Sequence, residues 1–142
     1  PPIASCLWKM RATSATDSQY SHQTYITIMD ESLAIINRTY EAYKAVVKVT
    51  YYLDKRWRFT LGASIEESLL SLLRELVMAK TAPRPLKAAY LIQAGGHLEV
   101  CAFKLRLCLE VAVQNPTTIF QIQAVLQDIG RQLGGWKRSL SS

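Results

Sequence analysis

The 142-residue sequence lacks an uncharged apolar run of membrane-spanning length, and it is short of acidic side chains and cysteine. A transmembrane helix needs about 20 mostly apolar residues, and even the apolar region 69–79 is interrupted by Arg74 and Glu75. The N-terminal segment has no basic region followed by an apolar stretch, so no secretory signal is expected. Apolar residues nevertheless make up 49% of the chain, which excludes a disordered protein. We therefore expect a folded domain outside the membrane.

The three cysteines do not form a disulfide pattern. Cys101 and Cys108 are seven residues apart on one expected helix, a separation of about 10 Å that a disulfide cannot span. Their apolar neighbours indicate that they serve as small core residues. Free thiols of this kind favour a reducing compartment, so we expect the cytoplasm.

The sequence also lacks the usual signatures of catalysis and metal binding. Neither His22 nor His97 has an acid three residues before it, as a di-metal helical bundle would require. His97 and Cys101 are spaced to share one helical face, but a zinc site needs four ligands. The adjacent Glu66 and Glu67 complement a helix dipole instead of forming an acid pair. With no phosphate-binding glycine loop or nucleophile motif either, we expect no enzyme activity, cofactor, metal or small-molecule substrate.

Two regions differ in composition. Residues 1–29 are rich in serine, threonine and proline, and we expect an N-terminal arm or a segment derived from a tag or from upstream sequence. Met10 and Met29 are alternative natural starts. Within this region, residues 24–28 fit either a strand or the lead-in to a helix. Residues 30–142 form the expected globular domain.

Apolar residues recur every three or four positions over four segments, which predicts four amphipathic helices. The helices are expected at 31–53, 60–80, 86–113 and 118–139. The first stripe comprises Leu33, Ile36, Tyr40, Tyr43, Val47, Thr50 and Leu53. The second comprises Leu61, Ile65, Leu69, Leu72, Leu76 and Ala79. The third comprises Ala94, Leu98, Cys101, Leu105, Cys108 and Ala112, and the fourth Ile122, Val125, Leu126, Ile129, Leu133, Trp136 and Leu140. Short connections predict an all-α, antiparallel, up-down-up-down four-helix bundle.

Polar and glycine residues suggest where these helices begin and how they pack. Thr60 is expected to cap the second helix, and Thr118 with Gln121 matches a capping box for the fourth. The glycine pair at 95–96 is expected to allow close approach of a neighbouring helix, with a local kink as the alternative. The glycine pair at 134–135 is expected to let a neighbouring helix or subunit approach closely.

Basic residues outnumber acidic ones by 17 to 11, giving a net charge of +6 and a pI near 9.4. An excess of this kind favours polyanionic partners. One basic cluster falls in the expected first connector: Lys55, Arg56 and Arg58. A second is expected at the opposite end of the bundle: Lys80, Arg84, Lys87, Lys137 and Arg138. Lys44 and Lys48 are expected on the outer face of the first helix, and Lys104 and Arg106 add charge to the third.

Aromatic residues are interleaved with the first cluster. Trp57 and Phe59 alternate with the cations of the connector, a pattern that suits phosphate neutralisation combined with base stacking. The same two rings could instead close the end of the bundle. Five aromatic residues fall outside the apolar stripes and are candidate subunit contacts: Tyr51, Tyr52, Trp57, Phe103 and Phe120.

Three motifs in order resemble one known family. They are Arg58-Phe-Thr-Leu-Gly62, the Ala-Phe-Lys-Leu-Arg-Leu run at 102–107, and Ile129-Gly-Arg-Gln-Leu-Gly-Gly-Trp136. Over residues 30–139 they resemble the Avd-type four-helix-bundle family, the accessory proteins of diversity-generating retroelements. The related proteins encoded in 23S rRNA intervening sequences usually carry a Ser-Ile-Pro-Ala-Asn-type turn in helix two, which is absent here. Asp54 also stands where the family usually has a proline.

The resemblance implies a non-catalytic, pentameric, basic protein that binds a reverse transcriptase and nucleic acid, RNA or DNA. The nucleic-acid contacts carried over onto this chain are Lys55, Arg56, Arg58, Arg131, Lys137 and Arg138. The alternative is an interaction scaffold of the 23S rRNA intervening-sequence type that binds only protein.

Overall fold

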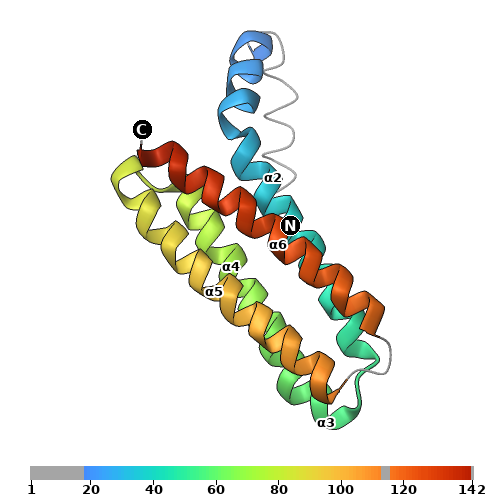
Figure 1. The fold of residues 1–142 in the computed structure, drawn as a ribbon. Helices are drawn as coiled ribbons and strands as arrows, with labels where there is room; N and C mark the ends of the chain where they lie inside the picture. The colour runs from blue at the N-terminus through green and yellow to red at the C-terminus, as the bar shows by residue number, and fades with distance from the viewer. Residues whose placement is uncertain (1–17, 113–115, 142) are drawn as a thin grey trace, which may run out of the picture. The chain divides into compact units, whose positions relative to one another are not determined.

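The computed structural model describes residues 18–112 and 116–141, with side chains from residue 32 onward, and these residues are almost entirely helical (Figure 1). The elements are α2 (Ser18–Tyr51), α3 (Lys55–Trp57), the π-helical turn η1 (Arg58–Gly62), α4 (Ala63–Thr81), α5 (Arg84–Val111) and α6 (Pro116–Ser141). The chain divides into two compact units, Pro1–Glu31 and Ser32–Ser142. All side-chain packing described below belongs to the second unit. Within the described residues, no helix combines the length and apolar character needed to cross a membrane.

The first helix begins earlier than its apolar pattern predicts. Helix α2 starts at Ser18 instead of residue 31, so residues 24–28 are helical. Residues 18–31 contain neither glycine nor proline, so nothing in this segment interrupts the helical backbone. The apolar period reports which face is buried, and it says little about where a polar helix begins.

The expected connector between the first two helices, residues 54–59, is itself largely helical. Asp54 has an extended backbone, and its carbonyl accepts hydrogen bonds from the Trp57 and Arg58 amides at 2.9 and 2.8 Å, which starts a helix. The Ala63 amide then bonds to the carbonyl of Arg58, five residues earlier, so η1 leads into α4 without a break. Thr60 does not cap α4, because its hydroxyl donates to the Arg56 carbonyl inside this helical run at 2.7 Å.

The fourth helix also starts before its predicted cap. Helix α6 begins at Pro116, where the fixed φ of proline suits a first helical position. Thr118 and Gln121 therefore lie inside the helix and do not form a capping box at its start.

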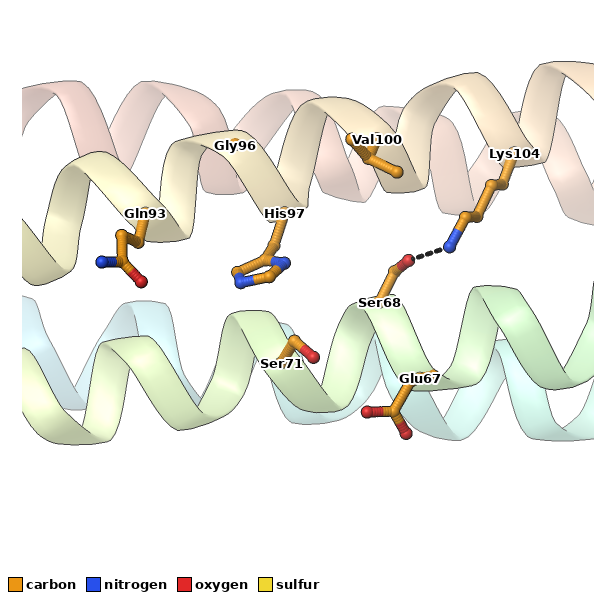
Figure 2. A pocket seen from close by; sticks show the side chains of 8 residues that line it. All are labelled: Glu67, Ser68, Ser71, Gln93, Gly96, His97, Val100 and Lys104. Atoms are coloured by element: carbon orange, nitrogen blue, oxygen red, sulfur yellow. Dashed lines mark hydrogen bonds between the residues drawn. The ribbon is translucent and has the colours of Figure 1, made fainter.

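Helices α4 and α5 lie side by side and are linked by Lys104. Its ammonium donates to the Ser68 hydroxyl at 2.6 Å and to the Ser64 carbonyl at 3.2 Å (Figure 2). Near the other end of the same pair, Lys87 at the start of α5 donates to the carbonyls of Ala79 and Lys80 at 2.7 and 2.9 Å. Two lysines of α5 thus join it to α4 at widely separated positions.

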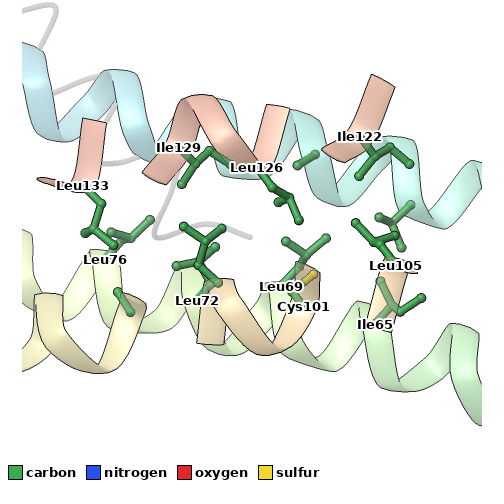
Figure 3. Packing of buried hydrophobic residues seen from close by; sticks show 14 of the residues in the cluster. Ile65, Leu69, Leu72, Leu76, Cys101, Leu105, Ile122, Leu126, Ile129 and Leu133 are labelled. Carbon is green, nitrogen blue, oxygen red and sulfur yellow. The ribbon is translucent and has the colours of Figure 1, made fainter. Parts of the chain in front are cut away.

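A single apolar core includes residues from α2, α4, α5 and α6. The second, third and fourth predicted stripes are confirmed, since every member is buried or half-buried. Figure 3 shows Leu69 and Leu72 of α4 facing Leu126 and Ile129 of α6, with Cys101 of α5 alongside. All four long helices line one residual void of about 10 Å³, too little space for a stable water. The core is closely packed.

The predicted stripe of the first helix is confirmed only in part. Thr50 and Leu53 are buried as predicted and Leu33, Ile36 and Tyr43 are half-buried, but Tyr40 and Val47 are exposed. The other buried positions each lie one residue before a predicted one: Ser32, Ile35, Thr39, Ala42 and Val46. The predicted and the observed positions both recur at helical spacing. The prediction chose the outer set because its apolar side chains are larger. Thr39 can be buried because its hydroxyl donates to the Ile35 carbonyl at 2.8 Å, which leaves no unpaired donor.

The glycines of α5 and η1 meet very different surroundings. A Cβ at Gly95 would lie 3.7 Å from Leu133 of α6, an ordinary contact distance, whereas Gly96 has no atom within 4 Å. Helix α5 is continuous through both glycines. At Gly62 a Cβ would lie 3.1 Å from Thr50, whose hydroxyl is held by Glu66 at 2.6 Å.

We predict that Gly62→Ala is less stable than Gly96→Ala by about 2 kcal/mol. Alanine gains up to about 1 kcal/mol over glycine in an open helix, whereas forcing a methyl against an anchored side chain costs about 1–3 kcal/mol. Urea denaturation of both variants and the wild type measures this difference. Equal stability of the two variants would show that Thr50 yields to the new methyl group.

Candidate nucleic-acid interface

The three cations of the first connector have different roles. Lys55 and Arg56 are exposed on α3, and the Arg56 guanidinium lies 4.8 Å from the Trp57 ring centre. Arg58 is half-buried, donates to the Leu53 carbonyl at 3.3 Å and lies 5.5 Å from the Tyr51 ring centre. It holds the end of α2 against η1. Lys55 and Arg56 are therefore accessible to a ligand, whereas Arg58 is largely used by the fold.

The two aromatic residues of the connector also differ in exposure. Trp57 is half-buried and packs against the core, which fits closure of the bundle end. Phe59 keeps 67% of its surface exposed. Phe59 therefore does not close the bundle end in the way that Trp57 does. Trp57 is also the one predicted subunit-contact residue of five that is not exposed, since Tyr51, Tyr52, Phe103 and Phe120 all are.

The exposed face of α2 carries alternating aromatic and cationic side chains. We call this face the tyrosine–lysine ridge, and it consists of Tyr40, Lys44, Lys48, Tyr51 and Tyr52. Steps of three or four residues keep the helical members on one face, over about 16 Å from Tyr40 to Tyr51. Lys44 lies 5.4 Å from the Tyr40 ring centre and pairs with Glu41 at 3.2 Å. The rings of Tyr51 and Tyr52 meet edge to face at 5.3 Å.

The sequence pattern places the lysines of this ridge on the outer face of the helix but misplaces Tyr40. It predicts Tyr40 in the core, and it indicates Tyr51 and Tyr52 only as subunit contacts. The signal that could have placed Tyr40 is its spacing from Lys44 and Lys48. Residues four apart on a helix share one face, so a buried Tyr40 would have placed Lys44 in the core too.

The second basic cluster comes from the connection between α4 and α5 and from the C-terminal part of α6. Figure 1 shows the connection between α4 and α5 beside the C-terminal end of α6. Its members differ in availability, because Lys87 binds two carbonyls and Lys80 is half-buried. Lys137 and Arg138 are exposed, and the Arg138 guanidinium lies beside Gly134, 3.3 Å from the position of an added Cβ. Arg84 is exposed as well.

Arg131 is engaged in an ion-paired group. Asp128 accepts hydrogen bonds from Arg131 and from Arg38 of α2, each at 3.1 Å. The hydrogen bond from Arg131 and the nearby charge of Arg38 hold the pKa of the Asp128 carboxyl below its ordinary value. Arg131 is therefore already paired on the surface.

A groove between α4 and α5 is the clearest cavity among the described residues. It has a volume of about 470 Å³, and Figure 2 shows Gln93 and His97 of α5 extending toward α4, where Ser71 lies. Lys104 at one end is bonded to Ser68 and Ser64. The described residues contain no cluster of three or more histidine, cysteine or acidic side chains suited to a metal ion. Burial raises the pKa of the nearby Cys101 thiol to about 12, which keeps it protonated and unreactive at neutral pH.

Helix α5 presents a second exposed face, and this one is apolar. Its outward residues are Ile92, Val100, Phe103, Leu107 and Val111, of which Phe103 is 66% exposed. These positions follow helical spacing over nearly the whole length of α5. A helix that is apolar on both its inner and outer sides is typical of one covered by further protein.

We predict that Lys87→Met lowers the free energy of unfolding by about 1–2 kcal/mol, because two carbonyls at the end of α4 lose a charged donor. Lys137→Met is the matched control. Its ammonium makes no hydrogen bond or ion pair within residues 32–112 and 116–141, so little change is expected. Denaturant unfolding of both variants tests this, and equal losses would contradict the structural role of Lys87.

We also predict that the stabilising effect of Asp128 depends on pH. A carboxyl whose pKa is lowered by folding stabilises the protein above the ordinary aspartate pKa of about 3.9, and this effect is lost as the pH falls through the lowered value. The melting temperature of Asp128→Asn should therefore lie below that of the wild type at neutral pH. The two should converge in acid, whereas a constant difference would contradict the ion-paired arrangement.

Comparison of the chain with protein-family models, with curated proteins and with solved structures found no match. The geometry of the described residues is therefore the basis for assigning a role.

Proposed function

We propose that this protein is a non-catalytic nucleic-acid-binding accessory protein of a diversity-generating retroelement, which acts in the cytoplasm. It would bind RNA or DNA and a reverse transcriptase, without cofactor, metal or small-molecule substrate. The observation that carries the proposal is a set of exposed side chains around the end of α2, where Lys48, Lys55 and Arg56 lie within four residues of the exposed Tyr52 in the sequence. Cations next to exposed rings are the elements of a single-chain nucleic-acid groove or platform.

The charge of the globular unit supports the same role. Residues 32–142 contain 15 basic and only 8 acidic side chains. Of the described acids, Glu41, Glu110 and Asp128 already pair with cations. The side-chain ammonium groups of Lys48 and Lys55 make no hydrogen bond or ion pair with the described part of the chain, and both residues are exposed. An uncompensated positive surface attracts polyanions at long range.

The proposed architecture is an antiparallel, up-down-up-down bundle. Its support is the pairing of Ser64 and Ser68 with Lys104, and of Ala79 with Lys87. Along these pairs the residue number rises on α4 as it falls on α5. The contacts of Gly95 with Leu133 and of Gly130 with Leu98 follow the same rule for α5 and α6.

Self-association is part of the proposal. The apolar outer face of α5 supports burial against another protein surface. The number of five subunits comes from the family resemblance. Cross-linking and light scattering of the purified protein measure it directly.

One observation favours a second function. The outer face of α5, including Phe103 and Leu107, would also suit a scaffold that binds only protein, as in the alternative related to 23S rRNA intervening sequences. Such a scaffold would not be retained on RNA or heparin in a salt-dependent way, so chromatography on both separates the two functions.

We predict that changing Lys48 and Lys55 together to glutamine weakens nucleic-acid binding and reduces its salt dependence. The slope of log affinity against log salt should fall by about 0.7 to 0.9 for each lost phosphate contact. Arg58 is left unchanged because its loss would also disturb the connector. Fluorescence anisotropy over a salt series gives both affinity and slope.

The control variant changes Arg74 and Arg106 to glutamine. It loses the same charge from positions that already contact Ser71 and Glu110, so its affinity should stay near that of the wild type. If both double variants lose affinity equally, binding follows net charge and the face of α2 is not the contact surface.

A further inference from the structure

We propose that the tyrosine–lysine ridge selects single-stranded over double-stranded nucleic acid, with Tyr52 as its main base-stacking residue. This inference rests on the proposed function and specifies the ligand of the same surface. Its starting point is the exposure of Tyr52, Tyr51 and Tyr40, which keep 84%, 66% and 51% of their surface in water. Two of these rings lie on α2 and the third belongs to the turn that directly follows it. Large rings left exposed in this way form a recognisable surface for a planar partner.

The contacts of the rings favour Tyr52 as the platform. Tyr51 is flanked by the Arg58 guanidinium at 5.5 Å and by the Tyr52 ring at 5.3 Å. Tyr40 has the Lys44 ammonium at 5.4 Å. Tyr52 contacts no cation and no ring besides Tyr51 among the described residues, yet the edge-to-face pair orients it. A ring that is already oriented loses little conformational freedom when a base stacks on it.

The cations stand where the backbone of such a strand would pass. Lys48 lies one helical turn before Tyr52, and Lys55 lies three residues after it at the start of α3. A base can stack beside a phosphate contact of its own strand only if that base is unpaired and turned outward. In a duplex the faces of the bases are covered by their neighbours, so the rings would meet only sugar and phosphate. The arrangement therefore favours a single strand.

The same surface is less suited to a protein partner. Lys48, Lys55 and Arg56 are exposed and lie within four residues of Tyr52 in the sequence. The acids near this stretch in the sequence are Asp54 and Glu41, the latter paired with Lys44. Lysine is depleted in the cores of protein interfaces because it must lose its water there. The outer face of α5 offers the apolar surface that a protein partner requires, so the two faces have complementary chemistries.

The test measures binding of the full chain to a labelled single-stranded 12-mer of thymidine and to a 12-base-pair duplex at the same salt concentration. The wild type should bind the single strand more tightly. Tyr52→Ala should weaken single-strand binding about tenfold, within the range found for the loss of one stacked base, and change duplex binding little. Its salt slope should stay unchanged because no phosphate contact is lost.

Three further variants test whether the planar ring at this position is what the strand contacts. Tyr52→Phe keeps the ring and should keep wild-type affinity, whereas Tyr52→Leu is apolar but not planar and should resemble Tyr52→Ala. Phe103→Ala removes an equally exposed ring on α5 and should bind like the wild type. If the wild type binds duplex as tightly as single strand, or Tyr52→Ala binds the single strand normally, the inference is overturned while the proposed function stands. If the wild type binds neither ligand, both fall.

A protein partner at the ridge is also a measurable outcome. Loss of reverse-transcriptase binding in Tyr52→Ala, with single-strand affinity unchanged, would assign the ridge to that protein and overturn the inference. Circular dichroism melting of each variant confirms that the bundle is folded, which is expected because Tyr52 contributes little to the core.

Discussion

Burial of one continuous set of leucine and isoleucine side chains on α4 constrains the rest of the second unit. Leu69, Leu72 and Leu76 are fully buried, and they meet α5 and α6 in one core. An α-helix turns by about 100° per residue, so fixing the inward side of a helix also fixes what it presents to solvent. The ridge on α2 and the apolar face on α5 are consequences of this packing, since each is what remains outside when the core closes.

The basic residues illustrate how a fold divides one kind of side chain between structure and surface. Lys87, Lys104 and Arg58 bind backbone carbonyls or a buried serine, and they secure helix ends and the α4–α5 pair. Lys48 and Lys55 carry the same charge without such bonds among the described residues. A cation held by several protein acceptors must give them up before it can bind phosphate, which lowers its value as a ligand contact. Net charge alone therefore overstates the size of the basic surface.

The two exposed faces suggest separate partners. The ridge combines rings with water-exposed lysines, whereas the α5 face consists of aliphatic residues and one phenylalanine. In the proposed role, the first would attract polyanions, and burial of apolar area would drive association at the second. Because the faces belong to different helices, one protein could hold nucleic acid and another protein subunit in the same complex. This division fits the adaptor role that we propose.

The sequence determined most of the helical architecture and three of its four buried faces. On α4, α5 and α6 the large apolar residues have helical spacing, and no second face of similar pattern competes as the buried one in the prediction. Leu72, Leu105 and Ile129 were therefore identifiable as core residues. On α2 the period was equally clear, but two adjacent faces shared it. Only tertiary packing decided that Thr39 and Ala42 lie inside and Tyr40 outside, because small residues allow the close approach that a tyrosine would prevent. The position of Arg58 over Tyr51 was likewise beyond the sequence, since it depends on the turn from α2 into η1. Periodicity shows which residues share one face of a helix. Which of these faces is buried depends on the neighbouring helices that pack against it.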